Sequence, residues 1–117
     1  MEERKELLER LLKFEKPIEP TKAALAKFPW DSDIELVFLS ASHFLNLFKR
    51  YLNGNVTADE VENWANAIEG RDDVGFVAGN KKVLREIIHE LANPLLTQPL
   101  TKKRVEEFQN QLESKML

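Results

Sequence analysis

The sequence predicts an all-α protein, a single-domain bundle of about five or six helices covering residues 1–117. Three observations lead to this fold class. The chain contains only 4 glycines and 5 prolines, fewer than most globular proteins of its length. Apolar residues recur at spacings of three and four along most of it, as they do on one face of a helix. Capping and turn residues separate these segments, and no internal repeat or linker interrupts them.

Two helices are expected near the N-terminus, at residues 2–14 and 22–28. Prolines at positions 17 and 20 stop the first helix, and Pro29 ends the second. We expect Thr21 to cap the second helix. The first helix carries an apolar stripe made of four leucines, Leu7, Leu8, Leu11 and Leu12.

Residues 34–39 form the ambiguous segment. Their isoleucine, valine and phenylalanine content is typical of a strand, although the same residues could be the first turns of a long helix. We expect a short extended segment, with Ser40 capping a helix that starts at Ala41. No second strand-like run lies nearby, so a strand here would have no partner.

Three further helices are predicted with clearer boundaries. The first runs from Ala41 to Asn53 and ends before Gly54, a residue suited to the left-handed position after a helix. Thr57 and Glu60 have the spacing of a capping box, which opens a helix that Gly70 ends. Asn80 is expected to cap a helix over 81–92, and the segment between them, residues 71–79, reads as a loop.

A last helix is expected from Lys102 to about Ser114, with Thr101 as its cap. Its apolar side is formed by Val105, Phe108 and Leu112.

The chain has no cysteine, which excludes disulfides, thiol nucleophiles and cysteine-ligated metal centres. The charged N-terminal segment has no apolar stretch of signal-peptide length. The longest apolar run, Leu36–Leu39, is far shorter than a membrane span. We therefore expect a soluble cytoplasmic protein with no membrane partner.

The formal net charge is −3, but it is distributed unevenly. Residues 1–30 carry +1, residues 31–73 carry −6 and residues 74–117 carry +2. The chain lacks the dense basic stripe of a nucleic-acid binder. No phosphate-binding glycine motif is present either, so neither nucleic acid nor a nucleotide cofactor is expected.

The acidic middle segment contains the best candidate site, which is a surface for binding another protein. An acidic patch beside an aromatic side chain such as Trp64 can steer and hold a basic partner. The competing interpretation is structural: Trp64 belongs to the core and Arg71 bridges Asp73. The candidate partner-binding residues are Asp59, Glu62, Asn66, Glu69, Arg71, Asp72 and Asp73.

Metal or enzymatic chemistry is the alternative, and it would depend on His43 or His89. Glu86 and His89 have the Glu-x-x-His spacing of di-iron bundles, but Ser40 stands at the matching position before His43. Half of such a site is missing, so we expect no catalytic residue, metal ligand or cofactor.

Two other features of the sequence could take part in contacts. Trp30 stands between Pro29 and an acidic turn, where it either plugs one end of the bundle or forms an exposed anchor. We favour the plug. The leucine stripe of the first helix offers a third function, self-association as a structural unit.

Several strings resemble a group of small, uncharacterised bacterial helical proteins. The most specific runs from Trp64-Ala65-Asn66 to Glu69-Gly70-Arg71-Asp72-Asp73, with further likeness at Tyr51–Gly54 and Leu91–Pro94. The resemblance covers roughly residues 30–115 and implies a helical fold without an assigned activity. In size, helicity and acidity the chain is also similar to immunity proteins of colicin-like toxin systems, although it shares no motif with them.

These observations favour a non-enzymatic protein-binding module. Its most concrete form is an immunity-like or antitoxin-like inhibitor that covers a basic surface with residues 59–73. The sequence leaves the oligomeric state and the identity of the partner open.

Overall fold

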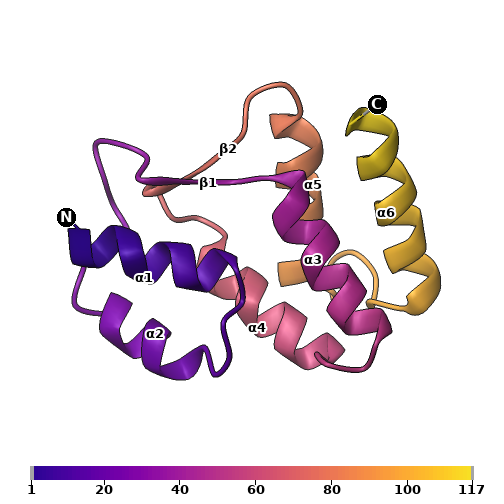
Figure 1. Ribbon diagram of the computed structural model, residues 1–117, viewed down its shortest axis with the longest axis horizontal. Helices are drawn as coiled ribbons and strands as arrows, with labels where there is room; N and C mark the ends of the chain where they lie inside the picture. Colours follow the sequence, from indigo (N-terminus) through magenta and orange to yellow (C-terminus); the bar gives the residue numbers. More distant parts are fainter. Residues whose placement is uncertain (1, 117) are drawn as a thin grey trace.

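Six α-helices and a two-stranded parallel sheet make up the fold (Figure 1). The computed structural model describes residues 2–116, and the side chains of residues 3–114. In chain order the elements are α1 (Glu2–Leu12), α2 (Glu19–Leu25), β1 (Val37–Leu39), α3 (Ala41–Leu52), α4 (Ala58–Ile68), β2 (Val74–Phe76), α5 (Lys81–Ala92) and α6 (Lys102–Met116).

The predicted helical class and helix number are confirmed, and only one helix is displaced. The second helix was expected at 22–28 with Thr21 as its cap, but α2 begins at Glu19 after an N-cap at Ile18. Pro20 falls in the first turn, where its missing N–H breaks no helical hydrogen bond. Thr21 is therefore a buried residue within the helix and not its cap.

The extended segment expected near 34–39 is confirmed as β1, but the expectation that it would lack a partner is wrong. β1 pairs in parallel with β2, placing Val37 opposite Val74 and Leu39 opposite Phe76. The partner strand lies within residues 71–79, which were expected to form a loop. A strand of three residues with a glycine at its centre is too short for a period of two to be recognised, so tertiary contacts define this strand.

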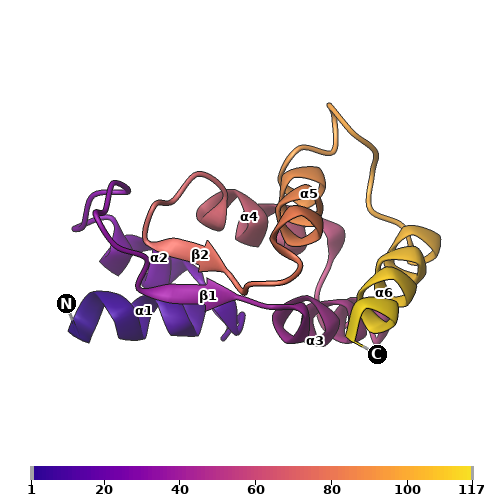
Figure 2. The same ribbon diagram turned by 90° about the horizontal axis from the view of Figure 1, so that it is seen from above.

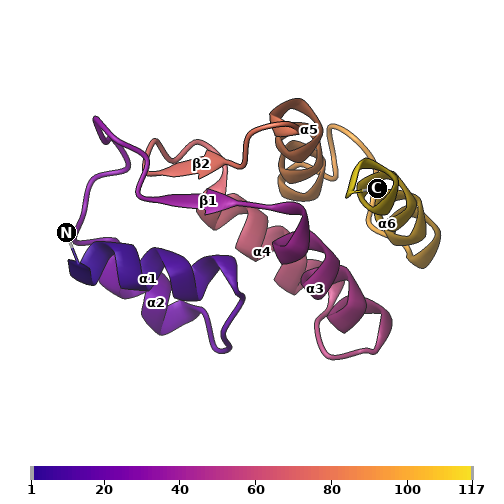
Figure 3. The same ribbon diagram turned by 45° about the horizontal axis from the view of Figure 1, so that its top comes forward.

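The sheet lies at the end of the molecule that holds α1 and α2. In two views β1 runs between β2 on one side and α1 on the other (Figures 2 and 3). Helices α3 and α4 form the connection between the two strands. Helix α6 packs mainly against α3, at the opposite end from α1 (Figure 1).

One hydrophobic core joins these elements, and Trp64 of α4 lies inside it with no exposed surface. The Trp64 ring meets Phe44 edge to face at 5.9 Å between centroids. Its Nε1–H donates to the carbonyl of Leu11 at 2.7 Å, so the one polar atom of the ring is satisfied in the core. This confirms the core interpretation of Trp64 and removes it from any surface patch.

The leucine stripe of α1 is also internal. All four leucines, at positions 7, 8, 11 and 12, are at most 6% exposed. Because the core of the same chain covers this face, it offers no surface for self-association, and the third function suggested by the sequence loses its physical basis.

The caps at the starts of α4 and α6 are confirmed. The Glu60 N–H donates to Thr57 Oγ1 at 3.1 Å, and the Thr57 N–H donates back to the Glu60 carboxylate at 2.9 Å. This bond and the Lys16 ammonium lower the pKa of Glu60. Thr101 caps α6 through the Arg104 N–H at 3.1 Å. Asn80 precedes α5 as expected but makes no side-chain cap bond.

Candidate functional site

Four of the seven predicted partner-binding residues lie along one side of α4. Their spacings of three and four residues place Asp59, Glu62, Asn66 and Glu69 on a single helix face. Asp59 and Asn66 are exposed, and Glu62 and Glu69 are half-buried. We call these four residues the acidic stripe. Asp72 is exposed in the turn that follows α4 and adds a further carboxylate near its end.

Arg71 and Asp73, by contrast, are internal. Asp73 has no exposed surface and Arg71 is 7% exposed. The Arg71 Nε–H donates to Asp73 Oδ1 at 2.9 Å, and a second N–H donates to Oδ2 at 3.1 Å. The structural interpretation of this pair is therefore confirmed, and neither side chain is placed where it could meet a partner.

A third charged residue completes this internal cluster. Arg4 of α1 donates from Nε to Asp73 Oδ2 at 2.9 Å and from a terminal nitrogen to the Pro29 carbonyl at 2.8 Å. We call Arg4, Arg71 and Asp73 the buried ionic cluster. It links α1 to the segment before β1 and to the start of β2. No pattern in the sequence distinguishes Arg4 from the many other charged residues on α1.

Trp30 covers the outer side of this cluster. The Arg71 guanidinium lies 4.6 Å from the centroid of the Trp30 ring, within the range of a cation–π contact. Trp30 as a whole residue remains 45% exposed. Trp30 is thus neither a fully buried plug nor a free anchor, because it shields a buried ion pair with one face and meets solvent with the other.

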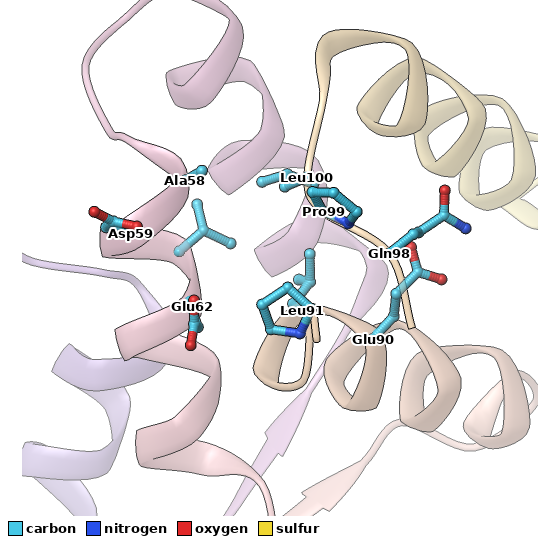
Figure 4. A pocket seen from close by; sticks show the side chains of 10 residues that line it. Ala58, Asp59, Glu62, Glu90, Leu91, Gln98, Pro99 and Leu100 are labelled. Carbon is cyan, nitrogen blue, oxygen red and sulfur yellow. The ribbon is translucent and has the colours of Figure 1, made fainter. Parts of the chain in front are cut away.

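A pocket lies beside the N-terminal half of the acidic stripe (Figure 4). Its volume is about 210 Å³. Asp59 and Glu62 stand on one side and Pro99 and Leu100 on the other, with Leu91 between them (Figure 4). The pocket is thus an apolar depression with carboxylates on its rim.

Glu90 also lines this pocket, but its charge is already compensated. Arg104 of α6 donates to both Glu90 carboxylate oxygens, at 2.6 and 2.7 Å. This pairing with Glu90 is the main reason that the pKa of Arg104 is raised above its usual range. Asp59 and Glu62 make no ion pair with any residue in the range 3–114, so they carry the free negative charge of the rim.

The loop that forms one wall of the pocket carries two solvent-exposed leucines at its tip. Leu95 is fully exposed and Leu96 is 79% exposed. The loop protrudes from the molecule between α5 and α6 (Figure 2). We call Leu95 and Leu96 the leucine tip. The leucine tip was not among the predicted features, although two adjacent leucines between Pro94 and Pro99 are a recognisable signal.

Hydrogen bonds hold the leucine tip in one shape. The N–H groups of Leu96 and Thr97 both donate to the Asn93 carbonyl, at 3.1 and 3.0 Å. The Thr97 hydroxyl donates to the same carbonyl at 2.8 Å. The two leucines are therefore presented by a turn with a defined conformation.

The two histidines have structural contacts on this fold. His89 Nδ1 lies 2.8 Å from Glu69 Oε2, and Asn93 donates to the other oxygen of the same carboxylate at 3.0 Å. Glu86, the other member of the Glu-x-x-His pattern, is exposed. In the part of the chain that the structure describes, no group of three or more histidine, aspartate or glutamate side chains is arranged to hold a metal ion.

His43 takes part in the start of α3. Its Nδ1 accepts the Ser40 N–H at 3.0 Å, which requires the unprotonated nitrogen. Burial and the Lys13 ammonium lower the pKa of His43 below its ordinary value of 6.5. The neutral ring therefore acts as a helix cap.

Among the described residues, no helix is both long enough and apolar enough to cross a membrane.

Comparison with protein-family models, with curated proteins and with solved structures finds no match to this chain. The site must therefore be interpreted from its own geometry.

Proposed function

We propose that this protein is a non-enzymatic binding module that holds another protein through the acidic stripe and the leucine tip. The observation that carries the proposal is that two exposed leucines belong to a loop that shares a pocket with two uncompensated carboxylates. The pocket between them joins the two features, since Asp59 and Glu62 form one wall and the leucine-bearing loop forms the other.

Each feature supplies a different part of recognition. Exposed carboxylates attract a basic surface over a distance and increase the rate of association. Apolar side chains that leave water on binding supply most of the affinity, and a preformed turn lowers the entropy lost on association. The geometry favours a partner with an apolar socket surrounded by basic residues.

The most concrete form of the proposal is an inhibitor of the immunity or antitoxin kind. A nuclease toxin presents a basic surface because its substrate is a phosphate polymer. An acidic protein of this size could cover such a surface. The similarity in character to colicin-like immunity proteins supports this form.

The test begins with the tagged full-length chain purified from its native host, followed by identification of any bound protein. Binding to that purified partner is then measured for Asp59→Lys/Glu62→Lys and for Leu96→Ser. We expect the charge reversal to weaken affinity at least tenfold and to flatten its salt dependence. Leu96→Ser should weaken affinity to a similar degree without changing the salt dependence.

The matched control is Glu106→Lys/Glu113→Lys, which makes the same change of charge at exposed positions on α6. Both positions lie outside the proposed surface, so the affinity should stay within about threefold of the original. Equal weakening by the control and by the stripe variant would show that only total charge matters and would contradict the proposal. Asp73 is left unchanged in this test because its substitution would disturb the core.

A further inference from the structure

A second and larger pocket lies between β2, α5 and the C-terminal end of α4. Its volume is about 430 Å³, within the range of small-molecule sites. Four apolar side chains line it, those of Ile68, Val74, Phe76 and Ile88. The pocket is separate from the one beside the leucine tip, and it shares only Glu69 with the acidic stripe. We call it the β2 pocket.

The free edge of β2 forms one wall of the β2 pocket. The Val37 N–H donates to the Asp73 carbonyl, and the Val77 N–H donates to the Leu39 carbonyl. In a parallel ladder alternate residues face the neighbouring strand, so Val74 and Phe76 direct their N–H groups away from β1. Among the described residues, no group outside the strand pairing accepts a hydrogen bond from either N–H.

A cation and an anion border adjacent residues of this strand. The Arg85 guanidinium of α5 lies 5.4 Å from the centroid of the Phe76 ring. The Glu35 carboxyl lies against Gly75, so close that a Cβ built there would be 2.5 Å from Glu35 Cδ. Both side chains line the β2 pocket. Neither makes an ion pair with any residue between 3 and 114.

Two of the other charged groups at this pocket already have partners. The Arg71 guanidinium forms an ion pair with the Asp73 carboxylate, and the Glu69 carboxylate contacts Nδ1 of His89. Asp72 lies on the rim and is exposed, as Glu35 and Arg85 also are. The groups free to receive a ligand are therefore two backbone N–H donors, one guanidinium, one carboxylate and the apolar wall, with Asp72 adding negative charge at the mouth.

We propose that the β2 pocket binds a free α-amino acid with an apolar side chain. The ligand carboxylate accepts hydrogen bonds from the edge of β2 and from Arg85. The ligand ammonium group pairs with Glu35, and the ligand side chain packs against Ile68 and Ile88. This ligand class presents a carboxylate, an ammonium group and an apolar chain on one carbon atom, which matches the groups that surround the pocket.

The test is a titration of the ¹⁵N-labelled full-length protein with L-leucine, followed by amide chemical shifts. We expect saturable shifts concentrated at Val74, Gly75, Phe76 and His89. Two analogues separate the contributions of the charges: 4-methylpentanoate lacks the ammonium group and leucinamide lacks the carboxylate. Each should bind at least tenfold more weakly than leucine, because each leaves one charged protein group without its partner.

Variants assign the contacts. Arg85→Gln should weaken leucine binding at least tenfold, and Glu35→Gln should do the same. The matched controls are Lys82→Gln and Glu86→Gln, which remove a positive and a negative charge from exposed positions of α5 outside the pocket. Both controls should bind leucine as the unchanged protein does.

Three results would overturn the proposal. The first is a set of shifts that stays linear in leucine concentration at 20 mM, which would indicate nonspecific contact. The second is equal binding of all three ligands, which would show a merely apolar pocket. The third is saturable shifts that map to the leucine tip in place of β2. Unchanged melting temperatures of the Arg85 and Glu35 variants would show that any loss of binding is not a loss of fold.

Discussion

Asp73 is a fully buried carboxylate that accepts hydrogen bonds from two guanidinium groups. The buried ionic cluster carries one excess positive charge, which the carbonyl of Pro29 and the ring of Trp30 help to accommodate. Removing one member of such a cluster lowers the free energy of unfolding by more than the intact cluster adds to it, because the remaining buried charges lose their counter-charge. The sequence places Asp73 beside the exposed Asp72, and residue type alone cannot distinguish the two.

Asp73→Asn should therefore lower the free energy of unfolding by about 3 kcal/mol, because it leaves two buried guanidinium groups without a counter-charge. Urea denaturation followed by circular dichroism measures this change. The neighbouring Asp72→Asn is the control, and we expect it to change the free energy by less than about 0.5 kcal/mol. Equal effects of the two substitutions would show that the cluster does not hold the fold together.

At the scale of elements, the starts of α4 and α6 were predictable and the pairing of the two strands was not. Thr57, Glu60 and Thr101 act through hydrogen bonds to residues three positions away, so short sequence patterns are enough to identify them. The pairing of Val37 with Val74 spans more than thirty residues, and no local pattern encodes it. The cap formed by His43 was harder to predict than the other caps. Its contact with Ser40 is local, but the contact exists only when the His43 ring is neutral.

The cap formed by His43 should make stability depend on pH. Because the pKa of His43 is lowered in the folded protein, the unfolded chain binds the proton more readily once the pH falls to about 6.5. The free energy of unfolding contributed by this group is complete above that pH and decreases as the pH is lowered towards the folded pKa.

Urea denaturation at pH 7.5, 6.5 and 5.5 measures this dependence. His43→Gln should show a smaller loss of stability between pH 7.5 and 5.5 than the unchanged protein shows, whereas His89→Gln should retain the slope due to His43. An unchanged slope in His43→Gln would contradict the assignment of His43 as a cap that requires the neutral ring.

At the scale of the whole molecule, the core joins all helices, but α6 has few neighbours. It rests mainly on α3, where the Phe108 ring stacks on Phe48 at 5.4 Å between centroids.

The helical class could be predicted because periodicity and capping recur along the chain. The site could be predicted only in part, since the acidic stripe follows from helical spacing while the leucine tip and the β2 pocket depend on tertiary contacts.

We expect α6 to open without the rest of the fold, because local stability follows buried contact area. Amide hydrogen exchange should show a lower opening free energy for Val105 and Leu112 than for Val61 and Ala65. Phe108→Ala should remove most of the protection in α6 and leave that of α4 nearly unchanged. Loss of protection in both helices together would instead show a single cooperative unit.

The buried ionic cluster also has a consequence for how the chain is made. The ribosome adds Asp73 to the growing chain 69 residues after Arg4. Until then the leucines of α1 cannot pack against Trp64, and the Arg4 guanidinium has no carboxylate with which to form an ion pair. Helix α1 is therefore synthesised well before the groups that secure it, and the nascent chain must keep α1 from other apolar surfaces until β2 has emerged.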